Sequence, residues 1–398
     1  MNLFNVYPLY DITPVKAVDC TIFDDKGVEY LDLYSGHGVI SIGHTQPDYV
    51  AKLKNQLDHL GFYSNAIQNP LQVELAQKLG KLSGLEDYEL FLCSSGAEAN
   101  ENALKLASFH NGKSRVVAFH NSFHGRTSAA VAVTDNKKIV APINAQQEVT
   151  FLPLNQIELV EAELAKGDVS SVIIEGIQGV GGLDQGTTEF FQALEKACKK
   201  HDVVLILDEV QSGYGRSGKF FSFQHHGINA DIISVAKGMG NGFPVGAILI
   251  SPKFEASFGL LGTTFGGSHL SCAAGIAVLD VIEKLDLQKN VNEVYAYFLE
   301  KIKEVDGIKQ VKGKGLMLGL EFDFDVAALR KKLIIEKHIF TGSANNKNLL
   351  RILPPLTVKK TDIDTFVKAL KESLEELKTK HTIILTGFQN LLGINKFR

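Results

Sequence analysis

The feature that most limits the possible folds is an alternation of short apolar runs and helical patterns between residues 90 and 251. The runs are rich in Val, Ile and Leu without apolar/polar alternation, which is typical of strands buried on both faces of a mainly parallel, helix-covered sheet. Six runs are candidate strands: RVVAFH, EVTFLPL, VSSVIIEGI, VVLILDEV, DIISVAKG and VGAILIS. Residues 187–201, TTEFFQALEKACKKH, predict an amphipathic helix between two of them. We therefore predict an α/β fold.

The two ends of the chain have a different pattern. TIFDDKGVEYLDLY near the start predicts a hairpin, and DIDTFVKALKESLEELKTK near the end predicts a surface helix. A chain of 398 residues is also long for a single core. We expect a large domain at 46–285, a smaller domain built jointly from 1–45 and 286–380, and a tail of unknown role at 381–398.

Composition excludes several classes of partner. The 41 basic and 45 acidic residues give a net charge of −4, so neither nucleic acid nor an anionic membrane is indicated. There is no apolar run of about 18 residues and no secretory signal in MNLFNVYPLY. The cysteines are far apart and lack metal-type spacing: Cys20, Cys93, Cys198 and Cys272. We expect a cytoplasmic protein without a metal site that acts on small molecules.

Three ionisable residues stand where predicted strands end. SVII ends at Glu175, VVLIL at Asp208 and DIISVA at Lys237. Ligands of open α/β sheets bind outside the carboxyl ends of the strands, so these side chains should share one rim. A lysine that loses hydration there favours its neutral, nucleophilic form. An aspartate in the same pocket could keep a pyridinium nitrogen protonated.

CSSGAEANENALKLAS predicts a helix start that can bind an anion. Ser95 and Glu98 have the spacing of a capping box, and Gly96 and Ala97 leave backbone N–H groups free in the first turn. An ordinary capped helix is the alternative interpretation. Together with the lysine and the aspartate, a phosphate site implies pyridoxal phosphate as the cofactor.

A second glycine-rich stretch, GYGRSGKF, nearly matches the phosphate loop of nucleotide hydrolases. Phe220 stands where that loop needs a hydroxyl for magnesium, and FFSFQHHGIN after it is a poor helix. The sequence therefore disfavours an ATPase. The pair His225 and His226 has no further ligand nearby in the sequence, so it is interpreted as a turn.

LILDEVQSGYGRSGKFFSFQHHGINADIISVAKGMGNGFPVGA resembles the signature region of the class III aminotransferases, fold type I enzymes that use pyridoxal phosphate. The similarity continues through SSGAEANENALKLA, FHNSFHGRT, IQGVGG, GTTFGGSHLSCAAG and LLRILPPLTV, from about residue 8 to 375. Within the class it is most similar to the acetylornithine, succinylornithine and ornithine aminotransferases. The resemblance implies a mainly parallel seven-stranded sheet in the large domain and a small α+β domain built from both termini.

The resemblance also implies roles for individual residues. Lys237 would form the Schiff base with the cofactor and move the proton, and Asp208 would pair with the pyridine nitrogen. The other implied cofactor contacts are the phosphate binders Ser95, Gly96 and Ala97, the ring contacts Phe123, Val210 and Gln211, the strand-end acid Glu175, and Thr264 from the second subunit of a homodimer. Arg126 and Arg351 resemble the family's two binders of substrate carboxylates.

Departures from the family pattern concern the substrate. The chain reads EGIQGVGG where the family usually reads EPIQGEGG, with Gly176 for the proline and Val180 for the second glutamate. His37 lies near where relatives place a substrate-facing residue, and Ser268 and His269 replace the usual Asn-Pro.

The implied reaction moves the terminal amine of an N-acylornithine, acetyl- or succinylornithine, to 2-oxoglutarate, giving a semialdehyde and glutamate in arginine biosynthesis. Ornithine and 4-aminobutyrate are alternative donors. A non-catalytic scaffold of this fold would need a disrupted lysine and aspartate pair, and both residues are present.

Overall fold

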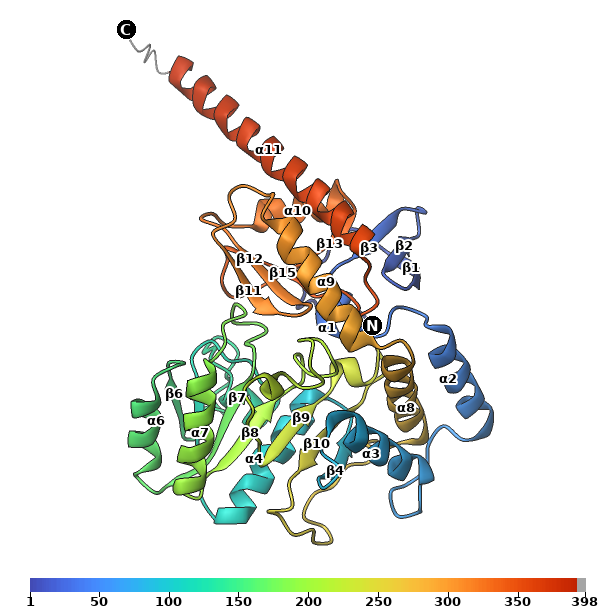
Figure 1. The fold of residues 1–398 in the computed structure, drawn as a ribbon, viewed down its shortest axis with the longest axis vertical. Coiled ribbons are helices and arrows are strands. Elements are labelled where there is room, and N and C mark those ends of the chain that lie inside the picture. The colour runs from blue at the N-terminus through green and yellow to red at the C-terminus, as the bar shows by residue number, and fades with distance from the viewer. Residues whose placement is uncertain (392–398) are drawn as a thin grey trace.

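The computed structural model describes residues 1–391, and its largest sheet has seven strands in the order β4-β10-β9-β8-β7-β5-β6 (Figure 1). These are β4 (Glu89–Cys93), β5 (Arg115–Phe119), β6 (Val149–Leu152), β7 (Val169–Glu175), β8 (Val204–Asp208), β9 (Ile232–Val235) and β10 (Gly246–Ile250). The strands from β9 to β6 pair in parallel, and β10 is antiparallel to both of its neighbours. The predicted mainly parallel sheet is confirmed.

Helices on both faces explain why the strands read as continuous apolar runs. Val116, Ala118 and Ile173 pack with α4 (Gly96–Asn111), while the alternate residues Val117 and Phe119 pack with α7. The helix α7 (Thr188–Lys200) is the one predicted at 187–201, and α6 (Ile157–Leu164) lies beside it. Because every residue of β7, β8 and β9 is buried, no polar alternation marks them.

Two four-stranded sheets complete the β structure, in the orders β1-β2-β3-β13 and β11-β12-β15-β14. The first contains β1 (Pro14–Val18), β2 (Thr21–Asp24), β3 (Glu29–Asp32) and β13 (Ile339–Phe340). The second contains β11 (Gln310–Lys314), β12 (Met317–Glu321), β14 (Gly342–Ser343) and β15 (Leu349–Ile352). The predicted hairpin is β2 with β3, and β13 pairs in parallel with β3. Segments from the two ends of the chain thus share one sheet.

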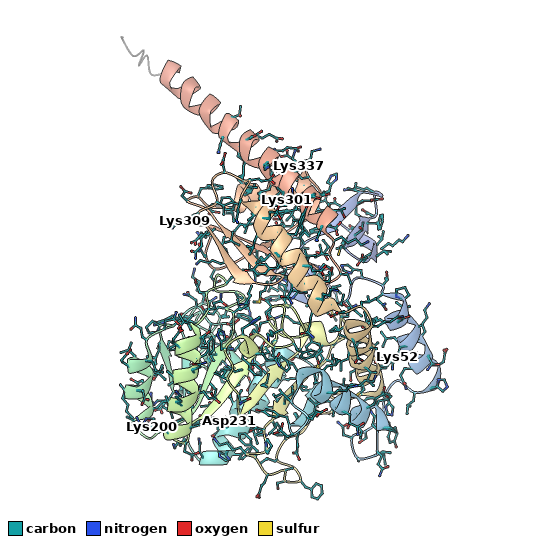
Figure 2. The ribbon with its side chains drawn as sticks, in the orientation of Figure 1. Lys52, Lys200, Asp231, Lys301, Lys309 and Lys337 are labelled. Atoms are coloured by element: carbon teal, nitrogen blue, oxygen red, sulfur yellow. The ribbon has the colours of Figure 1, made fainter. Side chains whose placement is uncertain are left out.

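The remaining helices are α1 (Ser35–Gly38), α2 (Pro47–His59), α3 (Pro70–Ser83), α5 (Ser128–Ala132), α8 (His269–Lys284), α9 (Leu287–Ile302), α10 (Ala327–Ile335) and α11 (Lys360–Leu391), with 3₁₀ turns η1 (Ser222–His225) and η2 (Lys237–Met239). Lys337 lies between α10 and β13. It joins this segment to α11 through ion pairs with Glu372, at 2.8 Å, and Glu376, at 3.2 Å (Figure 2).

The helix α11 contains the predicted surface helix and continues into the expected tail at 381–398 as far as residue 391; positions 392–398 lie outside the described residues. Within residues 1–391, no helix is both long and apolar enough to span a membrane.

Candidate active site

The strand-end residues meet as the sequence predicts. In the parallel register of β7 and β8, Glu175 stands opposite Asp208, and Asp208 stands opposite Ser234 of β9, three residues before Lys237. Glu175, Asp208 and Lys237 all line one cavity of about 400 Å³. The expectation that three consecutive strands direct their polar ends to one rim is confirmed.

Lys237 opens the turn η2 and has a left-handed backbone, with φ +47°. Such a conformation costs a non-glycine residue about 1–3 kcal/mol and persists only where neighbours enforce it. Here the Ser41 hydroxyl donates to Gly238 O at 2.7 Å, and the Tyr49 hydroxyl donates to Gly240 O at 2.7 Å. Burial lowers the pKa of the Lys237 amine, an effect opposed by Asp208 and Glu175.

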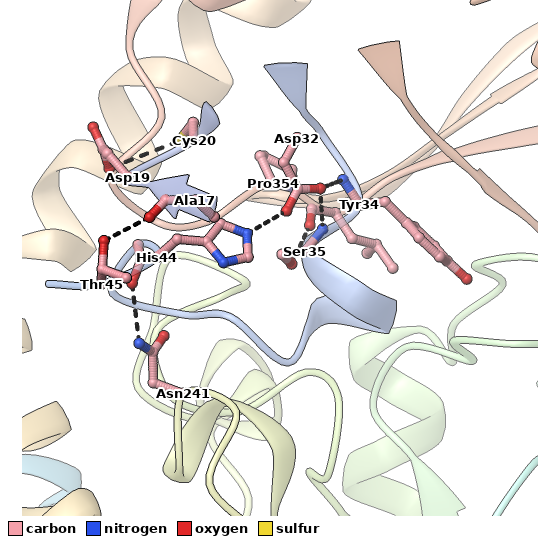
Figure 3. A network of polar contacts seen from close by, with 12 residues as sticks. Ala17, Asp19, Cys20, Asp32, Tyr34, Ser35, His44, Thr45, Asn241 and Pro354 are labelled. Carbon is pink, nitrogen blue, oxygen red and sulfur yellow. Dashed lines mark hydrogen bonds and ion pairs between the residues drawn. The ribbon is translucent and has the colours of Figure 1, made fainter. Parts of the chain in front are cut away.

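The lysine turn is also joined to the segment that follows α1. Asn241 accepts from the backbone N–H of Ser41, at 2.8 Å, and of Ile42, at 3.0 Å, and its amide donates to Gly43 O at 3.0 Å. Figure 3 shows Asn241 directed at this segment from below. The position of the lysine therefore depends on residues almost 200 positions away in the sequence.

Asp208 is buried and its carboxylate is fixed at both oxygens. Oδ2 accepts from the Asn100 amide at 2.8 Å and lies 2.7 Å from His124 Nδ1, while Oδ1 accepts from Val210 N at 3.0 Å. Next to a carboxylate, Nδ1 is the protonated nitrogen of His124. Asn100 and His124 are side chains of the site that the sequence reasoning missed, although both lie in quoted motifs; for Asn100 the signal was a polar residue on the buried face of α4.

Glu175 joins two loops of the cavity wall. Its carboxylate accepts from Phe123 N at 2.9 Å and from Gly179 N at 2.8 Å. Burial, with a further contribution from Asp208, raises the pKa of Glu175 to about 7. The side chain therefore organises the wall while it carries only part of a charge near neutral pH.

The start of α4 forms another side of the cavity. The Ser95 hydroxyl accepts from Glu98 N at 3.2 Å, as expected of a cap, but Glu98 itself accepts from Ser94 N, at 2.6 Å, and not from Ser95 N. A Cβ at Gly96 would lie 2.7 Å from Val210 Cγ1, so only glycine allows this approach. The first amides of the helix, at Gly96 and Ala97, have no acceptor within it and stand at the cavity.

The other predicted residues divide into two groups. Phe123, Arg126, Val210 and Gln211 also line the cavity. Arg126 is exposed and, among the described residues, forms no ion pair. The Gln211 amide donates to His37 O at 2.8 Å, but its buried Oε1 has no partner in the described part of the chain.

Three predicted residues do not line the cavity. Thr264 is exposed, and His37 is exposed with Nδ1 2.6 Å from the Tyr34 hydroxyl. Arg351 is buried behind the wall, where Nη1 donates to Gly179 O at 2.6 Å. Tyr34, which touches both Arg351 and His37, was not singled out in the sequence because only the tertiary fold brings it there.

Gly176 and Val180, the two residues that depart from the family pattern EPIQGEGG, have different surroundings. A Cβ at Gly176 would lie 2.0 Å from the Ser222 hydroxyl, which donates to the buried Glu209 carboxylate at 2.6 Å. The glycine therefore leaves room for this buried hydrogen bond. Val180 lines the cavity and contributes only an apolar surface there.

Comparison with known proteins identifies the family to which this chain belongs. The family model for class-III aminotransferases matches residues 5–374. The chain belongs to this family. It is 38% identical over 379 residues to the acetylornithine aminotransferase of Bacillus subtilis, covering 94% of this chain and 97% of that protein. It is 40% identical over 385 residues to that of Aquifex aeolicus, covering 94% and 99%.

Solved structures agree on the fold. The ornithine aminotransferase of Toxoplasma gondii superposes with a TM-score of 0.87 at 23% identity, covering 94% of this chain and 92% of that chain. An S-selective transaminase from Arthrobacter also gives 0.87, at 22% identity, covering 95% and 96%. The enzyme is a pyridoxal-phosphate-dependent aminotransferase of fold type I, and its substrates are an amino donor and a 2-oxo acid.

The cavity fits pyridoxal phosphate on its own chemistry. The open amides at the α4 start suit a phosphate, the fixed Asp208 carboxylate suits a protonated ring nitrogen, and the unpartnered Gln211 Oε1 lies at the wall. The nucleotide-hydrolase alternative fails on structure as well, since GYGRSGKF is followed by the 3₁₀ turn η1 and not by a helix that could bind phosphate.

Proposed function

We propose that this enzyme moves the terminal amine of an N-acylornithine, either acetyl- or succinylornithine, to 2-oxoglutarate, producing a semialdehyde and glutamate in arginine biosynthesis. The observation that carries the proposal is the identity of 36–40% to acetylornithine aminotransferases over nearly the whole chain, together with an intact Lys237 and Asp208 pair in one cavity.

The residues that would hold the cofactor follow from the cavity. Ser95, Gly96 and Ala97 would bind the phosphate, Asp208 the ring nitrogen and Gln211 the ring hydroxyl, while Val210 and Phe123 would pack on the ring faces. When bound, pyridoxal phosphate supplies the electron sink for breaking a C–H bond of the substrate. Lys237 would anchor the cofactor covalently and, once released, take the proton from the substrate carbon and deliver it to the cofactor.

The electrostatics of the cavity supports different roles for Lys237 and Glu175. Burial lowers the pKa of Lys237 and so favours the neutral amine, which is the form that accepts a proton. Glu175 would act by holding Phe123 and the Gly179 loop, not by transferring a proton. Arg126 at the cavity and Arg351 behind it would bind the carboxylates of the substrates, because guanidinium groups pair with carboxylates bidentately.

We further propose that the active unit is a cytoplasmic homodimer in which Thr264 completes the partner's phosphate site. Exposed apolar side chains lie next to Thr264 and on segment 62–67, whose Asn65 amide donates to Thr263 O at 3.2 Å, and this supports burial by a second copy: Phe62, Tyr63, Ile67 and Phe265. Phe62 and Phe265 already touch, with ring centroids 5.5 Å apart. The four cysteines are buried free thiols, which fits a reducing compartment.

A panel of amine donors tests the substrate. N-acetylornithine, N-succinylornithine, ornithine and 4-aminobutyrate are offered with 2-oxoglutarate, and glutamate formation is measured. We expect the highest kcat/KM with one of the two N-acylornithines. A higher kcat/KM with ornithine or 4-aminobutyrate would overturn the proposal and select that alternative donor.

A further inference from the structure

Arg351 is a buried cation whose described partners are all neutral oxygens. It lies in β15, where Nε donates to Ser343 O, Nη1 donates to Gly179 O at 2.6 Å, and Nη2 donates to the Tyr34 hydroxyl at 3.0 Å. Among the described residues, no carboxylate forms an ion pair with Arg351. Buried charges are normally paired, so this arrangement needs an explanation.

Tyr34 is held in place independently of Arg351. Its backbone N–H donates to Asp32 Oδ1 at 2.9 Å, and the other oxygen of Asp32 lies 2.8 Å from His44 Nε2. Figure 3 shows the Tyr34 ring directed away from this pair. A Cβ at Gly342 would lie 2.1 Å from Tyr34 Cε2, so the ring occupies space that only a glycine leaves free.

The hydrogen-bond donors of Arg351 and of the Tyr34 hydroxyl can be counted. A guanidinium has five N–H groups, and three are taken by the neutral oxygens, which leaves one on Nη1 and one on Nη2. Because the Tyr34 hydroxyl accepts from Arg351, its own proton is available for His37 Nδ1, 2.6 Å away. Desolvation of the ring and the nearby cation Arg351 lower the pKa of His37, which favours the neutral ring that can accept.

The two half-reactions place different demands on this arginine, if the proposed function holds. Glutamate brings a carboxylate to the reacting carbon, whereas a terminal amine brings only hydrogens there. Val180 lines the cavity and has no carboxylate, so it cannot pair with the arginine in the second case. The arginine in this enzyme therefore has to be stable without an anion.

We propose that Tyr34 is a positioning residue that keeps Arg351 in one place through both half-reactions and so determines how well a terminal-amine donor is accepted. With a terminal amine bound, the neutral oxygens still accept from three of the five N–H groups and hold the guanidinium in place. Arg351 adjoins the cavity wall at Gly179, and with glutamate bound its two remaining N–H groups would bind the carboxylate without displacing Tyr34. The inference rests on the proposed donor class, because only such a donor leaves Arg351 without an anion.

The variant Tyr34→Phe removes the hydroxyl and keeps the ring. Single-turnover rates are measured separately with glutamate and with whichever N-acylornithine the wild type uses. We expect the rate with the N-acylornithine to fall about tenfold more than the rate with glutamate, which corresponds to the loss of one hydrogen bond to a charged group. Equal changes in the two rates, or no change, would overturn the role of Tyr34. Absence of any wild-type reaction with an N-acylornithine would instead overturn the proposed function.

A rescue variant and a binding measurement separate positioning from general damage. Tyr34→Phe combined with Val180→Glu should regain the donor rate, since position 180 directly follows Gly179, which contacts Arg351, and a carboxylate there could pair with the arginine; the uncharged control Tyr34→Phe with Val180→Gln should not. Glutarate binding to Tyr34→Phe, measured by calorimetry, should stay within about threefold of wild type because the two carboxylate-binding N–H groups remain. Recovery with glutamine as well, or loss of glutarate binding, would show that Tyr34 acts only through packing.

Discussion

The three strand-end side chains differ in electrostatics although they share one cavity. Burial pushes the Lys237 amine and the Glu175 carboxyl toward their neutral forms, so the pKa of Lys237 falls and the pKa of Glu175 rises to about 7. Asp208 differs in its contacts, since both of its oxygens are engaged by Asn100, His124 and the backbone, which fixes the orientation of the carboxylate.

Lys237→Ala tests the assignment of the lysine. Borohydride should trap the cofactor on the peptide that contains Lys237 in the wild type, and Lys237→Ala should still bind cofactor but lose turnover, because no other residue is assigned to the proton transfer. Lys219→Ala is the matched control, since Lys219 is an exposed lysine nearby in the sequence. Trapping on a different lysine would refute the assignment.

The raised pKa of Glu175 predicts that the stability of the folded protein depends on pH. Its pKa is about 7 in the folded protein and about 4.5 unfolded, so the folded state binds more protons between these values. The contribution of Glu175 to the free energy of unfolding is fully present below pH 4.5 and is lost as pH rises to 7. The free energy of unfolding of the cofactor-free enzyme should therefore fall across this range, by on the order of 3 kcal/mol relative to Glu175→Gln. Parallel stability curves for the two proteins would contradict this.

At the scale of whole elements, burial decides what the sequence reveals. The strands β7, β8 and β9 are covered on both faces and read as apolar runs, so their ends and the three rim residues could be predicted. The edge strand β4 was not among the candidates, because it begins at the exposed Glu89 and is only partly buried. Contacts between distant segments, such as Tyr34 with Arg351, have no local pattern and could not be predicted.

The start of α4 depends on a close approach to the loop after β8. Gly96→Ala would place a methyl group 2.7 Å from Val210 Cγ1 and move the first amides of the helix away from the cavity. We expect cofactor affinity, measured by spectroscopic titration, to fall at least about tenfold, since phosphate binding depends on those amides.

The double variant Gly96→Ala with Val210→Ala is the control for this steric argument. Removing the two methyl groups of Val210 opens the space that the new Cβ needs, so affinity should recover in large part. An equally weak double variant would show that the glycine serves a purpose other than this contact.

At the scale of the whole molecule, the two ends of the chain meet in one sheet, where β3 pairs with β13. This pairing agrees with a small domain formed from 1–45 and 286–380 beside a large domain at 46–285, which stays a prediction. Five of the six named candidate strands pair in parallel in the main sheet, in agreement with the fold class, while β10 runs antiparallel to both of its neighbours.

The exposed position of Thr264 leads to a prediction about assembly. Two inactive variants, Lys237→Ala and Thr264→Asp, are mixed in equal amounts and allowed to exchange subunits. In a heterodimer with shared sites, one site combines an intact Lys237 with the partner's intact Thr264, and the other site carries both changes. Random exchange makes about half of the dimers heterodimers, so activity should return to about a quarter of wild type. If each site used only its own subunit, both variants would stay inactive in every combination, and mixing would restore nothing.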